Sequence, residues 1–514
     1  MSRWILFSIA VSLVAAPWAA SAAEPLTSDA RREVIAQVNS LLDTIYVIPE
    51  TADVMRRDLE DRLQRGEFDR ITSAQEFADT LTGILQGISH DRHLRVGLEG
   101  GSGTLGGPVR VRQGAPSGEG DGPVRVRLGS PSGEGDGPVR VRQGAPSAEG
   151  DGPVRVRRVA RPGGEDGGEP TPGRRVIRSD NAADNAAAGE GDIPAGLTEI
   201  DAFPESRMLP GNVGYVRITL FRGLPGDEEL AAALMAKVAG ADALIFDLRG
   251  CMGGFPDMVH FITSYLYDET PRHLLTYYHA DGPPDSAYTL VEIPGERMPN
   301  ADVYILTSSF TASGGEEFTH VLKHHGRATV VGETTAGAGH GGGVHPLPHG
   351  FNVFMPDFRP VHPVTGDGWE DRGVEPDVAV APSRALEVAQ VTALEARLAR
   401  GAGTEEDVLR GEVARLRQAI ESATPDPAAL QQFVGRYDIR EVTAGDAGLY
   451  LQRTGGPRLE LVPDSADQFH LAVMPDGLIR FVRGDDGAVV AVEVRYPNSD
   501  EWQRSWRDGF APAR

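Results

Sequence analysis

One serine stands where a predicted strand turns into a predicted helix. Residues 303–306 are short, apolar and rich in strand formers, and an apolar helical face begins at Phe318. Between them lies Thr311-Ala312-Ser313-Gly314-Gly315-Glu316. Such a turn exposes the Ser313 hydroxyl at a helix N-terminus, where free N–H groups and the helix dipole can stabilise an oxyanion. The chemistry would be nucleophilic attack on a carbonyl group, although serine is also a common helix N-cap.

Three further segments carry residues that would assist such a serine. The predicted strand 243–248 runs into a turn that contains Gly250, Gly253 and Gly254, and ligands of open α/β sheets bind at such strand ends. The Asp91-Arg92-His93 turn supplies an imidazole, and Glu370 supplies a carboxylate just before a short predicted strand. An imidazole can take the proton of a serine, and a carboxylate can fix the tautomer of that imidazole.

In this order the motifs resemble those of the tricorn-core, tail-specific and interphotoreceptor retinoid-binding-protein-like serine peptidases. The resemblance covers the N-terminal helical segment with its D-x-H ending and nearly all of residues 205–382. It implies a crotonase/ClpP-like core, hydrolysis of peptide bonds, and catalytic roles for Ser313, His93 and Glu370. It also implies an oxyanion hole formed by the N–H groups of Gly253 and Gly314.

The family uses either a serine–lysine dyad or a serine–histidine–glutamate set, and this sequence favours the second. The position of the dyad lysine is occupied here by Ala338. Lys323 lies ten residues from Ser313 along the predicted helix, about 15 Å away, which is too far for a base. Lys237 belongs to an unrelated predicted helix.

Two positions depart from the family pattern. Cys251 stands in the glycine turn where asparagine is commoner, and Arg92 stands where the tricorn-like enzymes carry a serine. The resemblance assigns the turn to oxyanion binding, so Cys251 is a poor candidate for a nucleophile.

Other assignments stay open from sequence alone. His90 is a second candidate for the base, although it fits better as a polar residue that closes a helix. Asp371 and Glu375 flank Glu370 and match the family pattern less well. A zinc site is a weaker alternative, because the spacing of its possible ligands is irregular: His340, His345, His349 and His362. Ser308 and Ser309 also offer hydroxyls, but they fit better as loop residues.

Composition limits the partners and the cellular compartment. A formal charge of −24 over 514 residues argues against a general affinity for nucleic acid or anionic lipid. Residues 1–22 have the pattern of a secretory signal peptide with cleavage before Ala23, so we expect an exported protein, periplasmic or secreted, without stable membrane insertion. The lone Cys251 excludes an intrachain disulfide.

The pattern along the chain predicts a largely parallel α/β sheet covered by helices, between a helical domain and a small antiparallel β domain. Residues 107–112 recur with a period of 15 in a polar, Gly/Pro-rich insertion that has too few apolar residues to form a core. The predicted parts are a signal peptide at 1–22, a helical domain at 23–100, a flexible insertion at 101–195, an α/β core at 196–383, a helical linker at 384–423 and a β domain at 424–514.

The sequence therefore predicts an exported serine peptidase that acts on peptides or proteins and uses no cofactor or metal. The insertion occupies the space where a PDZ-like module would lie, so a tail-binding module is not expected. Two alternatives are a non-catalytic carrier of apolar ligands on the same fold and a non-peptidase acyl hydrolase. Neither the cleavage preference nor the oligomeric state follows from the sequence.

Overall fold

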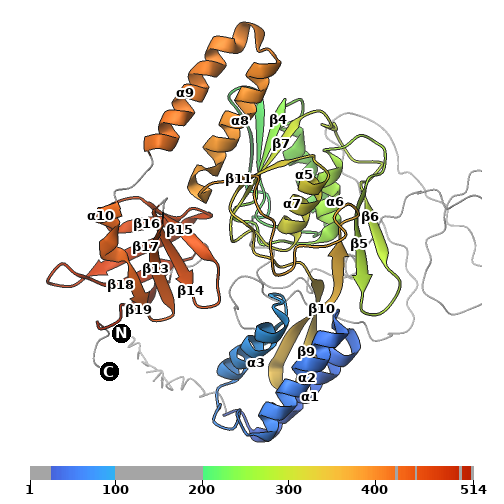
Figure 1. Ribbon diagram of the computed structural model, residues 1–514, viewed down its shortest axis with the longest axis vertical. Helices are drawn as coiled ribbons and strands as arrows, with labels where there is room; N and C mark the ends of the chain where they lie inside the picture. Colours follow the sequence, from blue (N-terminus) through green and yellow to red (C-terminus); the bar gives the residue numbers. More distant parts are fainter. Residues whose placement is uncertain (1–24, 99–200, 423–426, 446–447, 497–500, 511–514) are drawn as a thin grey trace, which may run out of the picture. The chain divides into compact units, whose positions relative to one another are not determined.

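The computed structural model describes residues 25–98, 201–422, 427–445, 448–496 and 501–510 (Figure 1). The predicted signal peptide and the predicted repeat insertion lie outside the described residues. Among the described helices, none combines the length and the apolar character needed to cross a membrane.

A six-stranded sheet forms the middle of the chain (Figure 1). Its order is β11-β8-β7-β4-β3-β2, and all neighbours run parallel except the β2/β3 pair. The strands are β2 (Glu205–Leu209), β3 (Val213–Arg217), β4 (Ala243–Asp247), β7 (Asp302–Thr307), β8 (Thr329–Gly332) and β11 (Val378–Ala379). The predicted parallel sheet is thus present, with one antiparallel edge; the finer crotonase/ClpP-like assignment stays a prediction.

Helices cover both faces of this sheet because its inner strands carry apolar side chains on both sides. One core combines residues such as Phe246 and Ile305 with α5 (Asp227–Ala236), α6 (Pro256–Ser264) and α7 (Gly314–His324). The opposite core combines residues such as Ile245 and Tyr304 with α8 (Ala385–Arg400) and α9 (Glu406–Ser422). The two packed faces fix the carboxyl ends of β4 and β7, where the serine and glycine turns begin.

A second, five-stranded antiparallel sheet was not predicted. It contains β1 (Arg95–Leu98), β5 (His273–His279), β6 (Asp285–Tyr288), β9 (Gly341–Leu347) and β10 (Phe351–Val361). Helices α1 (Ser28–Ile45), α2 (Pro49–Gln64) and α3 (Ala74–Ser89) pack on Phe351, Val353 and Met355 of β10. The N-terminal helices therefore share a core with strands some 250 residues later in the chain. The pairing of β1 with β10 brings the D-x-H turn to the α/β region.

The C-terminal residues form the predicted small antiparallel β domain. After the short helix α10 (Pro427–Leu430), each strand pairs with the next one along the chain. A bridge between Tyr437 and Arg507 joins the two ends of the sheet, which makes it nearly a closed barrel. The strands are β12 (Gly435–Tyr437), β13 (Arg440–Gly445), β14 (Gly448–Arg453), β15 (Arg458–Pro463), β16 (Gln468–Leu471), β17 (Met474–Arg483), β18 (Val489–Arg495) and β19 (Gln503–Trp506).

Candidate active site

The backbone at Ser313 is strained, as expected for an exposed nucleophile at a sharp turn. The residue joins β7 to α7 with φ 51° and ψ −120°, a conformation that costs a side-chain-bearing residue about 1–3 kcal/mol. Such strain persists only where the surroundings impose it. Ser313 is half-buried, and its N–H donates to Glu316 Oε2 at 2.9 Å.

The glycine turn after β4 lies directly against this serine. A Cβ added to Gly253, whose φ is 114°, would lie 2.6 Å from Ser313 Cβ and 3.1 Å from Gly314 N. The Ala312 N–H donates to Cys251 O at 3.1 Å and so ties the two turns together. Within the described residues, neither the Gly253 N–H nor the Gly314 N–H has a hydrogen-bond acceptor. Two free donors therefore lie beside the serine, an arrangement that suits an oxyanion.

The other nucleophile and base candidates near this turn have structural roles. Cys251 is fully buried, and burial raises the pKa of its thiol to about 12, so the reactive thiolate is not available near neutral pH. The Lys323 ammonium lies 3.0 Å from Asp377, on a part of α7 remote from the serine turn. The hydroxyl of Ser309 donates to Arg458 O, and that of Ser308 to a carbonyl before the glycine turn.

Glu316 is a buried carboxylate that connects the serine turn to a second segment. Its Oε2 accepts the N–H groups of Ser313 and Ala338, and its Oε1 accepts the N–H of Gly337 and the hydroxyl of Thr335. The side chain is fully buried, and burial raises its pKa to about 7 despite these donors. The sequence motif contained Glu316 but gave no sign of this role.

Replacing Glu316 by glutamine should lower the free energy of unfolding by about 1–3 kcal/mol. The amide nitrogen is best placed where Oε1 now lies, facing the Thr335 hydroxyl, which can turn to accept, and the buried Gly337 N–H, which loses its acceptor. Urea denaturation at about pH 8, above the raised pKa, measures this loss. The exposed Glu375→Gln is the matched control and should stay within about 0.5 kcal/mol of the parent. A Glu316→Gln protein as stable as the control would contradict the role.

His93 and Glu370 meet at the junction of β1 with the α/β region. One ligand-type atom from each of Asp91, His93 and Glu370 lies within 4.8 Å of the others. Glu370 Oε2 accepts the N–H groups of Gly339 and His340. The opposite oxygen, Glu370 Oε1, and the ring nitrogen His93 Nδ1 are both buried and lack a hydrogen-bond partner. The structure thus brings two of the three predicted catalytic residues together.

Asp91 and His340 belong to the same cluster, and the sequence did not identify them as members. Asp91 is fully buried; its Oδ2 lies 2.8 Å from His340 Nδ1 and accepts the Tyr46 hydroxyl at 3.3 Å. Its Oδ1 accepts the His93 N–H at 3.0 Å. The i, i+2 spacing of Asp91 and His93 is the local signal that could have predicted this last contact.

The surroundings shift the titration of this cluster. Burial, followed by the charge of Asp91, raises the pKa of Glu370 to about 7. Burial lowers the pKa of His93, which keeps its imidazole neutral and able to accept a proton. Burial also disfavours the charged form of His340, but the hydrogen bond to Asp91 and the negative charges of Asp91 and Glu370 together outweigh it, so the pKa of His340 is raised.

Four successive backbone amides link the serine turn to this cluster. Gly337 and Ala338 donate to Glu316, whereas Gly339 and His340 donate to Glu370. The two carboxylates thereby hold one segment from opposite ends. Ser313 and His93 are both described, and no hydrogen bond joins them here; catalytic contacts are often longer without substrate.

The remaining candidates from the sequence lie elsewhere. His90 is the C-cap of α3 and has a left-handed backbone with φ 58°. It therefore closes the helix, as the sequence suggested. Asp371 and Glu375 are exposed. The four histidines of the zinc alternative do not form one site: His340 pairs with Asp91 and His349 with Glu33. Among the described residues, the group with convergent ligand atoms is Asp91, His93 and Glu370.

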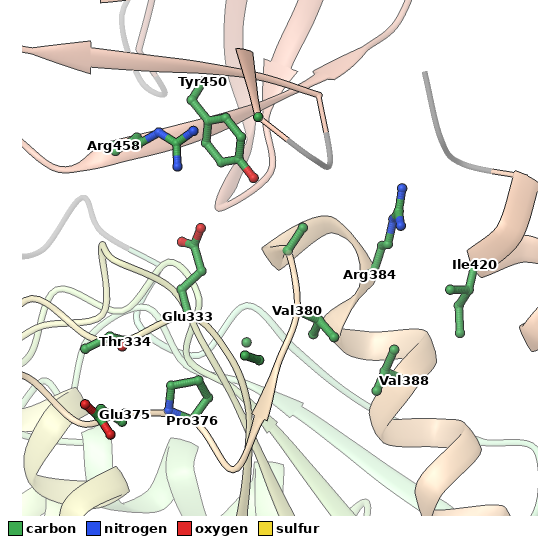
Figure 2. Close-up of a pocket in the computed structure, with 14 residues that line it drawn as sticks. Glu333, Thr334, Glu375, Pro376, Val380, Arg384, Val388, Ile420, Tyr450 and Arg458 are labelled. Carbon is green, nitrogen blue, oxygen red and sulfur yellow. The ribbon is translucent and has the colours of Figure 1, made fainter. Parts of the chain in front are cut away.

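The β domain contacts the nucleophile and glycine turns. Phe310 and Met252 pack into its apolar core, and a Cβ on Gly250 would lie 2.4 Å from Val473 O. Beside these contacts is a cavity of about 920 Å³ with Glu333 and Arg384 on one side and Tyr450 and Arg458 on the other (Figure 2).

The turn, the two free N–H donors and the histidine–carboxylate cluster are the parts that a serine-type hydrolase needs. The comparisons with known proteins specify it further. Residues 212–380 match the family described as Peptidase family S41, and residues 25–109 match the N-terminal domain of Peptidase_S41 in eukaryotic IRBP. Over these two stretches the chain is similar to peptidase family S41.

Curated relatives match a shorter stretch. The carboxy-terminal processing protease CtpA of Bacillus subtilis (strain 168) is 26% identical over 156 residues, 30% of this chain and 32% of the relative. The carboxyl-terminal-processing protease of Picosynechococcus sp. is 28% identical over 169 residues, 33% of this chain and 39% of the relative. The matched stretch thus spans about a third of the length of these relatives.

Two solved structures illustrate how far the likeness in space extends. The photosystem II D1 C-terminal processing protease is 24% identical with a TM-score of 0.29, covering 34% of this chain and 45% of that chain. The tricorn protease is 20% identical with a TM-score of 0.26, covering 40% of this chain and 18% of that chain.

Proposed function

We propose that the protein hydrolyses peptide bonds in exported peptides or proteins through Ser313, His93 and Glu370. The observation that carries the proposal is the strained Ser313 turn beside two N–H groups without acceptors, at Gly253 and Gly314. Backbone strain of this kind clusters at functional sites, and acyl transfer needs this combination of a serine with two free donors.

In the proposed reaction, Ser313 Oγ attacks the substrate carbonyl while His93 accepts the hydroxyl proton. The N–H groups of Gly253 and Gly314 hold the resulting oxyanion. Glu370 stabilises the imidazolium, which then protonates the leaving amine as the C–N bond breaks. Water, deprotonated by His93, attacks the acyl-enzyme and releases Ser313 and the second product.

Export to the periplasm or the medium is part of the proposal. It rests on the signal-peptide pattern of residues 1–22 and fits a hydrolase that acts outside the cytoplasm. The processing of carboxyl-terminal segments is the named activity of the Bacillus and Picosynechococcus relatives. We propose the same class of cleavage here for the part of the chain that matches them.

Labelling with a fluorophosphonate probe tests the mechanism directly. The parent protein should form a covalent adduct at Ser313 in a time-dependent reaction, because the probe reacts only with activated serines. The Ser313→Ala protein and the heat-unfolded parent should not be labelled. A parent protein that binds apolar ligands but never reacts would instead favour the carrier alternative. Labelling without cleavage of any peptide would favour a non-peptidase acyl hydrolase.

Glu370→Gln should lower kcat by about 10²–10⁴-fold, because the amide cannot stabilise the imidazolium as a carboxylate does. The pH profile of kcat/KM gives a second readout. The pKa of Glu370 is raised to about 7, so the carboxylate is protonated below that pH and activity should fall as the pH drops through about 7. The pKa of His93 is lowered, so its titration does not account for this limb.

The acidic limb should flatten in Glu370→Gln and remain in Asp371→Asn and Glu375→Gln, the neighbouring carboxylates. If one of these neighbours instead loses its activity while Glu370→Gln behaves like the parent, the orienting carboxylate must be reassigned.

A further inference from the structure

The cluster contains two buried polar atoms that the resting protein leaves without partners. His93 Nδ1 and Glu370 Oε1 are buried and make no hydrogen bond. Buried polar atoms are nearly always satisfied, so each unsatisfied atom calls for an occupant or a function.

The donor set and its spacing suit a divalent transition-metal ion. Asp91, His93 and Glu370 each offer one ligand atom, and these atoms lie within 4.8 Å of one another. In a tetrahedral zinc site, bonds of 2.0–2.2 Å place neighbouring ligand atoms about 3.4 Å apart, so small side-chain movements close the difference. A neutral imidazole with two carboxylates is a donor set that such ions accept.

The atoms behind the three ligands are already held in place. Asp91 is fixed by His340 Nδ1 at 2.8 Å and by the Tyr46 hydroxyl at 3.3 Å. Glu370 is fixed through Oε2 by the N–H groups of Gly339 and His340. Metal sites depend on such outer contacts to orient their ligands. A dication would also relieve the repulsion between the two neighbouring carboxylates, Asp91 and Glu370.

We propose that Asp91, His93 and Glu370 form a reversible inhibitory site for Zn²⁺ or a similar divalent transition-metal ion. The inhibition rests on the proposed function, whereas the binding of the ion does not. An ion at this place occupies the ring nitrogen and the carboxylate that general-base catalysis requires, so metal binding and hydrolysis exclude each other. The ion is an inhibitor and not a cofactor of the reaction.

Binding is tested on full-length Ser313→Ala protein, freed of metal with a chelator, so that turnover plays no part. Isothermal titration with Zn²⁺ should show one site per chain, and bound Co²⁺ should give the visible absorption of a low-coordinate ion. Glu370→Gln and His93→Gln should each weaken Zn²⁺ binding at least about tenfold, and His340→Ala should weaken it about 10–100-fold by releasing Asp91. Asp371→Asn, the adjacent carboxylate, should change nothing.

A second group of imidazoles provides the main competitor for the ion. The rings of His320, His324 and His362 lie 4.3–5.7 Å apart at one end of α7. His324→Ala should leave Zn²⁺ binding unchanged. If this variant loses the site while Glu370→Gln keeps it, the ion belongs to the α7 histidines and the proposal is overturned. It is also overturned if Ser313→Ala binds no Zn²⁺, or if Glu370→Gln, checked for folding by circular dichroism, binds it as tightly as the parent.

The inhibitory consequence is tested separately on the active protein. Zn²⁺ should slow cleavage of a peptide, and EDTA should restore the rate. Absence of cleavage under any condition would count against the proposed function and leave the binding result intact. One result would overturn the inhibitory role: the Ser313→Ala protein binds the ion at Glu370, yet cleavage by the parent is unchanged at saturating Zn²⁺.

Discussion

Ser313→Ala should lower kcat for peptide cleavage by about 10⁴- to 10⁶-fold, as removal of a catalytic serine does in other serine peptidases. The loss is this large because the described thiol and the Ser309 hydroxyl near the turn are not available to replace Ser313. Cys251 is fully buried, and the pKa of its thiol is raised to about 12. The hydroxyl of Ser309 is engaged with Arg458 O. The residual rate would come from the oxyanion donors and from substrate binding alone.

The fold should survive this substitution, since the Ser313 N–H still reaches the Glu316 carboxylate and this contact does not depend on the side chain of residue 313. Circular dichroism and urea denaturation should therefore match those of the parent. Ser309→Ala is the matched control: it removes a hydroxyl four residues away and should keep most of the activity. Retention of activity by Ser313→Ala, or its loss only in Ser309→Ala, would remove Ser313 as the nucleophile.

Local sequence predicted the serine turn and the central sheet well. The apolar run at β7, the glycines after Ser313 and the amphipathic start of α7 are all contained within some 25 residues. Strand and helix periodicity are local properties, so a single sequence reveals them. The glycine turn after β4 could be predicted for the same reason, and Gly253 does lie against Ser313.

The second sheet could not be predicted because its pairings are long-range and its strands are poorly marked. β9 opens with three glycines, Gly341 to Gly343, and β10 contains Pro356 and Pro360, which normally argue against a strand. The structure accommodates Pro356 at a register shift between β9 and β10. The pairing of β1 with β10 brings the D-x-H turn to the α/β region.

The inner contacts of the site were missed for a related reason. Asp91 stood inside the motif that identified His93, but its partner His340 lies 249 residues further on. Glu316 is the last residue of the serine motif, yet its carboxylate accepts hydrogen bonds from the N–H groups of Gly337 and Ala338, more than 20 residues further on. A motif reveals which residue types are present, whereas the atoms they contact are decided by tertiary packing. The sequence therefore pointed to the candidate reacting groups and left out the residues that contact them.

His93→Ala should be as damaging as Ser313→Ala, with a loss of about 10⁴- to 10⁶-fold in kcat, because a serine without its base is a weak nucleophile. Members of one catalytic unit act together, so the double variant should be no slower than either single one. His93 is suited to this role because burial keeps its imidazole neutral and because Glu370 lies beside it.

Two other histidines are the controls that make this prediction specific. His90→Ala removes only the C-cap of α3 and should leave kcat nearly unchanged. His340→Ala releases Asp91 and should reduce kcat by a smaller factor than His93→Ala, with the acidic limb of the pH profile displaced because Asp91 and Glu370 change their surroundings. Kinetics of the three variants on one peptide decide the matter. If His340→Ala matches Ser313→Ala while His93→Ala stays active, the base is His340, paired with Asp91, and the catalytic unit is Ser313, His340 and Asp91 instead.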